Sequence, residues 1–150
     1  MLALLVGALG FSPERSSAGI TERIVTNPYS GLAISGYDPV AYFTKAQASA
    51  GRPEFEARHA GVVWRFGNAG NRAAFLDQPA AYMPVFGGYD PVDVARGVAV
   101  AGHPELWLIL KDRLYLFHTA QARSRFAASA EQILAIAEQQ WPQLERTLVQ

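Results

Sequence analysis

Four short segments rich in aromatic and branched apolar residues, arranged as two pairs, predict two β-hairpins. The segments are Phe55 to His59, Val62 to Phe66, Leu106 to Leu110 and Leu114 to Phe117. Their aromatic and branched side chains are typical of antiparallel strands, as are the tight connections Ala60-Gly61 and Lys111-Asp112-Arg113. Because two hairpins can pair edge to edge, we expect them to share one four-stranded antiparallel sheet.

Helical spacing follows each hairpin. A capping Asn or Thr precedes Ala69 to Leu76 and Ala120 to Ala128, and helices over these ranges would cover the sheet with Phe75 and Phe126. Pro79 to Tyr82 predicts a further short turn of helix.

A long C-terminal helix is predicted from Ser129 to about Leu148, with a kink at Pro142. Its apolar residues recur at helical spacing, so we assign them to the core rather than to a partner surface. They are Ile133, Leu134, Ile136, Ala137, Trp141, Leu144 and Leu148.

Asp38-Pro39 and Asp90-Pro91 each combine a helix N-cap with a first-turn proline. The carboxylate accepts hydrogen bonds from free backbone N–H groups, and proline lacks the N–H that would be unsatisfied there. These pairs predict a helix over Val40 to about Ala48 and a shorter helix that ends at Gly97.

Both Asp-Pro pairs belong to a repeated pentapeptide, Gly-Tyr-Asp-Pro-Val, at Gly36 to Val40 and Gly88 to Val92. Further identities recur 51 residues apart: Gly51, Pro53, Glu54, Phe66, Ala69, Arg72 and Phe75 match Gly102, Pro104, Glu105, Phe117, Ala120, Arg123 and Phe126. Repeats of this length indicate a duplicated supersecondary unit. We therefore predict an α+β fold in which two similar helix–hairpin–helix copies, at about 35–84 and 87–135, are related by a pseudo-two-fold axis within one compact domain over 19–150.

Composition removes several classes of function. The 13 basic and 13 acidic residues leave no net charge and no Lys/Arg cluster, so nucleic-acid binding is not expected. The chain has no cysteine, which excludes disulfides and thiolate chemistry. His, Asp, Glu and Tyr remain for site chemistry, and no particular cofactor is indicated.

The first residues resemble a secretory signal. An apolar run from Leu2 to Phe11 precedes Ser16-Ser17-Ala18, a small-residue cleavage pattern that would leave a mature chain from Gly19 with no transmembrane segment. We expect export to the periplasm. The alternative is an apolar arm packed on the core of a cytoplasmic protein, since no Lys or Arg precedes the run.

Several motifs together resemble the YHS-domain family, specifically its small exported bacterial members. They are Gly-Tyr-Asp-Pro-Val-Ala-Tyr-Phe from Gly36, Val63-Trp64-Arg65-Phe66, Asn71-Arg72-Ala73-Ala74-Phe75, Pro79-Ala80-Ala81-Tyr82-Met83-Pro84 and Phe86-Gly87-Gly88-Tyr89. The resemblance implies a small α+β module related to metal-binding fingers, of a kind that also occurs in metal-transport and oxygenase proteins. Asp90 stands where the family commonly has a cysteine, and the Tyr-His-Ser letters are absent.

The candidate ligand-binding residues lie around the two repeated turns: Tyr37, Asp38, Tyr89, Asp90 and His118. We interpret the chain as a non-enzymatic binding or accessory module whose partner is an unidentified small ligand or protein. One alternative is an acid–base enzyme using Asp38 and Asp90, with His118 as a further candidate, because paired carboxylates have divergent pKa values. The other is a structural or docking protein.

Two further hypotheses concern His and aromatic side chains. No two of His59, His103 and His118 share a chelating spacing, so a histidine-centred metal site is not expected. Tyr37 and Tyr89, together with Tyr42, Phe43, Phe86 and Trp107, either line a cleft or pack between the copies, and we favour packing.

Overall fold

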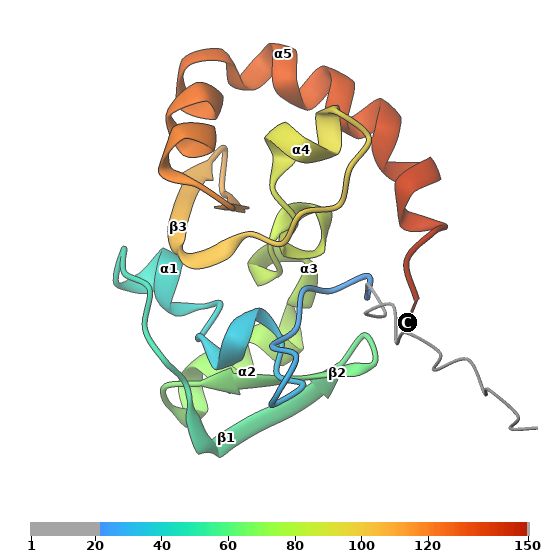
Figure 1. Ribbon diagram of the computed structural model, residues 1–150. Helices are drawn as coiled ribbons and strands as arrows, with labels where there is room; N and C mark the ends of the chain where they lie inside the picture. The colour runs from blue at the N-terminus through green and yellow to red at the C-terminus, as the bar shows by residue number, and fades with distance from the viewer. Residues whose placement is uncertain (1–21, 150) are drawn as a thin grey trace, which may run out of the picture.

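The computed structural model describes residues 22–149, so the expected signal segment and its cleavage after Ala18 lie outside the described residues. In chain order the elements are η1 (Ile34–Gly36), α1 (Ala41–Thr44), β1 (Arg52–His59), β2 (Val62–Phe66), α2 (Ala69–Asp77), α3 (Pro79–Tyr82), η2 (Val85–Gly88), α4 (Pro91–Ala95), β3 (His103–Leu110), β4 (Arg113–Phe117) and α5 (Ala120–Glu145). The α+β class, the two antiparallel hairpins and the long C-terminal helix are confirmed (Figure 1).

Both hairpins turn through two residues with positive φ. Ala60 and Gly61 have φ of 52° and 80°, and Lys111 and Asp112 have φ of 49° and 57°. Two consecutive positive φ values are the signature of a type I′ turn, whose twist matches that of the strands. The prediction that Arg113 belongs to the second turn is wrong, because Arg113 pairs with Leu110 in the ladder.

The prediction of one shared four-stranded sheet is wrong, since β1–β2 and β3–β4 form two separate two-stranded sheets. The free edge of β2 is occupied by the N-terminal segment: Leu32 bridges Val63 in parallel, and Ala33 N donates to Val63 O at 2.9 Å. In Figure 1 the early part of the chain and α1 lie between β1–β2 at the bottom and β3 above. The pseudo-two-fold relation between the copies stays a prediction.

Helix α1 is shorter than predicted and ends at Thr44 rather than near Ala48. Ala46 has a φ of 49°, a left-handed conformation that a helix cannot continue through. The other early helices agree with prediction, including α4, after which Gly97 has a φ of 77°.

Helix α5 joins the two predicted C-terminal helices without a loop. The backbone departs from helical geometry at Ser129, with a φ of −143°, which was not predicted. Pro142 lies inside the continuous helix, and the kink expected there stays a prediction. Within the predicted apolar stripe, Ala137 and Leu148 are buried but Ile136 is 49% exposed. Across residues 22–149, no helix has the length and apolar character needed to cross a bilayer.

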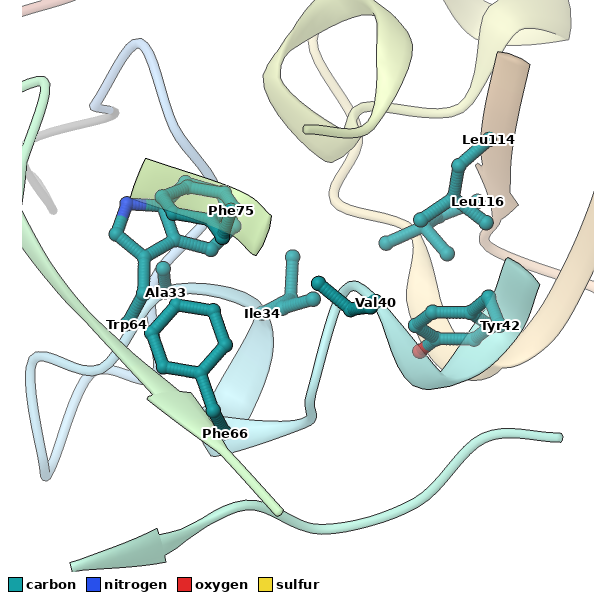
Figure 2. Close-up of a cluster of buried hydrophobic side chains, with 9 residues drawn as sticks. All are labelled: Ala33, Ile34, Val40, Tyr42, Trp64, Phe66, Phe75, Leu114 and Leu116. Atoms are coloured by element: carbon teal, nitrogen blue, oxygen red, sulfur yellow. The ribbon is translucent and has the colours of Figure 1, made fainter. Parts of the chain in front are cut away.

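One buried cluster contains residues from both hairpins: Ala33, Ile34, Val40, Tyr42, Trp64, Phe66, Phe75, Leu114 and Leu116. Figure 2 shows Ile34 and Val40 between the β2 and α2 aromatic rings on one side and Tyr42 with the β4 leucines on the other. The segment from Ile34 to Val40, which precedes β1 in the chain, therefore packs between the two hairpins, where we expected a shared sheet.

Each hairpin is also covered by the helix that follows it. Phe75 of α2 packs on Trp64 of β2, with ring centroids 5.0 Å apart. Phe126 of α5 packs on Tyr115 of β4 at the same separation, 5.0 Å. The predicted covering role of both phenylalanines is confirmed.

Candidate functional site

Asp38 is a buried tether within the first hairpin unit. Its side chain has no exposed surface, Oδ1 accepts from Val40 N at 2.9 Å, and Oδ2 accepts from Gly67 N and Asn71 Nδ2, both at 2.7 Å. Helix α1 begins only at Ala41, so Asp38 caps the turn before the helix. The carboxylate thereby joins that turn to the junction between β2 and α2.

Asp90 occupies a similar position in the second unit. It is the N-cap of α4, as predicted, and Oδ1 accepts from Val92 N at 2.8 Å. Oδ2 accepts from His118 N at 2.7 Å, which ties α4 to the end of β4. Burial raises the pKa of the Asp90 carboxyl above its ordinary value, although the hydrogen bonds from His118 and Val92 oppose this rise.

The two carboxylates do not form an open acid–base pair. Asp38 and Asp90 share no hydrogen-bond donor, and neither exposes any surface to solvent. A carboxylate that transfers a proton to a substrate must come within hydrogen-bond distance of it. Each of these side chains instead links its own turn to the residue that follows the hairpin, by accepting backbone hydrogen bonds from both.

A pocket of about 330 Å³ brings together two of the predicted residues, Tyr37 and His118, with His103. Tyr37 follows η1 and its hydroxyl donates to Glu105 Oε1 at 3.2 Å. Desolvation, followed by the bond to Glu105 and its charge, raises the pKa of Tyr37. The pocket is completed by Val25, Thr26, Pro28, Ser35, Ala101, Gly102 and Pro104.

Hydrogen bonds to the two imidazoles define their neutral tautomers. His118 Nδ1 lies 3.1 Å from the carbonyl oxygen of Ala101, which can only accept, so Nδ1 carries the proton and Nε2 the lone pair. His103 Nδ1 accepts from Glu105 N at 3.2 Å, so its proton is on Nε2. The neutral pair therefore offers an acceptor on His118 and a donor on His103.

Tyr89 lies beside the same groove and is itself buried. Its hydroxyl donates to the carbonyl oxygen of Glu22, and desolvation, with a smaller contribution from the Glu22 charge, raises its pKa to about 12. Its ring lines a neighbouring pocket of about 270 Å³, which shares Val25, Thr26, Pro28 and Ala101 with the first.

The remaining aromatic residues pack in the interior, as we favoured. The Tyr42 hydroxyl donates to Pro104 O at 2.7 Å, and its ring meets Trp107 edge-on at 5.3 Å. Phe86 packs on Trp141 at 5.4 Å. These contacts leave Tyr37 as the aromatic residue that borders the His103–His118 pocket.

His103 was not among the predicted site residues. A usable signal was the match between Ala50-Gly51-Arg52-Pro53 and Ala101-Gly102-His103-Pro104, which places His103 beside the second repeated turn. The bridges Tyr37↔Ala50 and Tyr89↔Ala101 make the corresponding backbone contacts.

The described residues contain no cluster of three or more His, Asp or Glu side chains that could hold a metal ion. Comparisons with protein-family models, with curated proteins and with solved structures found no match for this chain.

Proposed function

We propose that this protein is an exported, non-enzymatic binding module of the YHS type, which holds a small molecule in the pocket formed by Tyr37, His103 and His118. The observation that carries the proposal is the convergence of these three polar rings, from distant parts of the chain, on one pocket of about 330 Å³. A small concave site with apolar walls and a few polar groups is the usual form of a ligand site.

The lining indicates the kind of molecule that fits. Val25, Pro28 and Pro104 supply apolar contact. His103 Nε2 offers a hydrogen and His118 Nε2 a lone pair. The best match is a small, mostly apolar molecule that carries one acceptor and one donor. The His118 lone pair also suits a metal that the ligand itself carries.

The enzymatic alternative loses its proposed acid and base, because Asp38 and Asp90 are enclosed and hydrogen-bonded. The family assignment rests on the sequence motifs, and export rests on the N-terminal pattern. A docking function would need an exposed apolar patch. The large apolar side chains that are exposed between 22 and 149 are those of Tyr29, Leu76, Val98, Ile136 and Val149.

Native mass spectrometry of the protein purified from its own compartment, with elemental analysis of the same sample, tests this proposal. We expect a bound mass in the wild type and occupancy reduced by about tenfold in His118→Ala, which removes the ring but keeps the backbone N–H that Asp90 binds. Arg58→Ala, on the exposed side of β1, is the matched control and should keep the ligand. A wild-type monomer without ligand or metal would contradict the proposal.

A further inference from the structure

A separate pocket of about 290 Å³ lies where the N-terminal segment, the first hairpin turn and the end of α5 meet. Its lining comprises Arg23, Ile24, Ala60, Met83, Pro84, Gly87, Trp141 and Glu145. In Figure 1 the C-terminal end of the chain comes down beside the start of the described N-terminal segment, and Arg23 N donates to Val149 O at 2.9 Å. None of these residues belongs to the His103–His118 pocket.

The side chain of Arg23 has a nitrogen that makes no hydrogen bond. Its Nε is buried and has no hydrogen-bond partner, and it is the one such side-chain atom in residues 22–149. A buried donor without a partner is costly, and guanidinium retains its charge at all ordinary pH values. Arg23 also lines the pocket, so its positive charge favours an anionic group bound there.

Glu145 lines the same pocket with the opposite charge. Arg23 and Glu145 take part in none of the ion pairs formed within 22–149, so the two charges face one pocket without neutralising each other directly. Met83 and Trp141 also line this pocket and give it apolar and aromatic surface. Indole faces attract cations as well as apolar groups.

The close approach that forms this pocket depends on Gly87. Its φ is 63°, and a Cβ there would lie 1.9 Å from the carbonyl oxygen of Arg23. Gly87 O also accepts from Val25 N at 2.8 Å. The backbone of the N-terminal segment is therefore held against η2, with Arg23 directly at the pocket.

We propose that this pocket binds a small zwitterion, specifically an α-amino acid with an apolar side chain. Arg23 binds the carboxylate through its guanidinium group, Glu145 binds the ammonium group, and Trp141 and Met83 contact the side chain. A charge-assisted bond from guanidinium to carboxylate is among the stronger hydrogen bonds in proteins. The ligand supplies both missing partners at once, which neither a simple anion nor a simple amine can do.

Calorimetric titration of the full chain with three probes tests this inference: L-phenylalanine, 3-phenylpropionate, which lacks the ammonium group, and 2-phenylethylamine, which lacks the carboxylate. We expect L-phenylalanine to bind at least about tenfold more tightly than either analogue. Fluorescence of Trp141, compared between the wild type and Trp141→Phe, should report the same binding event.

Two variants separate the charges. Arg23→Gln should weaken L-phenylalanine binding by about tenfold and leave 2-phenylethylamine unchanged, whereas Glu145→Gln should weaken L-phenylalanine and leave 3-phenylpropionate unchanged. Glu138→Gln and Arg146→Gln, which alter exposed residues at the same end of the chain, are matched controls. His118→Ala should have no effect, so this result is independent of the proposed function.

If Arg23→Gln fails to fold, titration of the wild-type protein with the three probes still tests the proposal. Equal affinity for 3-phenylpropionate and L-phenylalanine, with no effect of Glu145→Gln, would overturn the zwitterion assignment in favour of a plain anion site. The absence of binding of all three probes up to about 10 mM would overturn the site itself.

Discussion

The carboxylate of Asp38 accepts a hydrogen bond from the backbone N–H of Gly67 at 2.7 Å, although the two residues are 29 positions apart in the chain. The bond joins the Tyr-Asp-Pro-Val turn to Gly67, the residue between the end of β2 and the N-cap of α2. Asp90 makes the corresponding bond to His118 N, 28 positions further along and also at 2.7 Å. Each aspartate thus fixes the position of the helix that follows its hairpin.

Replacing Asp38 by alanine should lower the free energy of unfolding by roughly 2–4 kcal/mol, because three buried or half-buried donors would lose their acceptor. Urea denaturation followed by circular dichroism measures this loss. Asp77→Ala, at the exposed end of α2, is the matched control and should change stability by less than about 0.5 kcal/mol. Equal stabilities of the two variants would show that Asp38 is not a tether.

Asp90 should make stability fall as the pH rises above about 4. Its pKa in the folded protein is raised above the ordinary value of 3.8, mainly by desolvation, so between these two values the folded state binds more protons than the unfolded state. The contribution of Asp90 is therefore fully present below the unfolded pKa and is lost as the pH rises through the folded pKa.

The free energy of unfolding of wild type and Asp90→Asn, measured by urea titration from about pH 3.5 to pH 7, isolates this effect because the other carboxyl groups cancel. The difference, wild type minus variant, should decrease as the pH rises. A difference that increased with pH would mean that the hydrogen bonds from Val92 and His118 outweigh desolvation.

Tyr89 should contribute stability that disappears at alkaline pH. Its pKa is raised by burial to about 12 from an ordinary 10.0, so its contribution is fully present below pH 10 and is lost as the pH rises through about 12. Unfolding measured between pH 9 and 12 should show the gap between wild type and Tyr89→Phe closing. Tyr29→Phe, at a side chain that is 97% exposed, should leave the pH profile of the wild type unchanged.

Gly102 should not tolerate a side chain. An added Cβ would lie 2.6 Å from Leu116 Cβ and 2.8 Å from the carbonyl oxygen of Gly88, which the Gly102 N–H already binds at 2.9 Å. We expect Gly102→Ala to lower thermal stability by roughly 2 kcal/mol or more, because the backbone must move apart. Gly51→Ala, which meets Arg65 at 2.5 Å, should cost a similar amount.

Gly70→Ala serves as the control for both glycine variants. Gly70 lies in α2, and its added Cβ would meet only the side chain of Asn68, at 3.2 Å. Alanine also favours helix over glycine. Retention of wild-type stability by Gly102→Ala would mean that the hairpin start can shift without loss.

Local patterns predicted much of the fold. The short strands, the two-residue turn at Ala60-Gly61 and the caps at Asn68, Thr119 and Asp90 depend on neighbours in the chain, and each was confirmed. The left-handed φ of Ala46, which ends α1 early, has no such signal, because alanine normally favours helix.

The candidate site was predicted only in part, because a pocket joins surfaces of several elements. Tyr37 and His118 were selected for their nearness to the repeated turns, and they do line one pocket. Asp38 and Asp90 were selected for the same reason, but they are fully buried and do not line it. Burial depends on what packs above a residue, which spacing along one segment does not specify.

By itself the sequence determined the elements, their order and the repeated turns, since these follow from bonds and contacts between residues close in the chain. Only the tertiary structure decided that Leu32 pairs beside Val63, so that the hairpins form separate sheets. It also decided that Arg23 and Glu145 face one pocket. Which segment pairs with the edge of β2, and which charged residues come to line one pocket, depends on the packing of the whole chain. In that packing, segments more than a hundred residues apart come into contact.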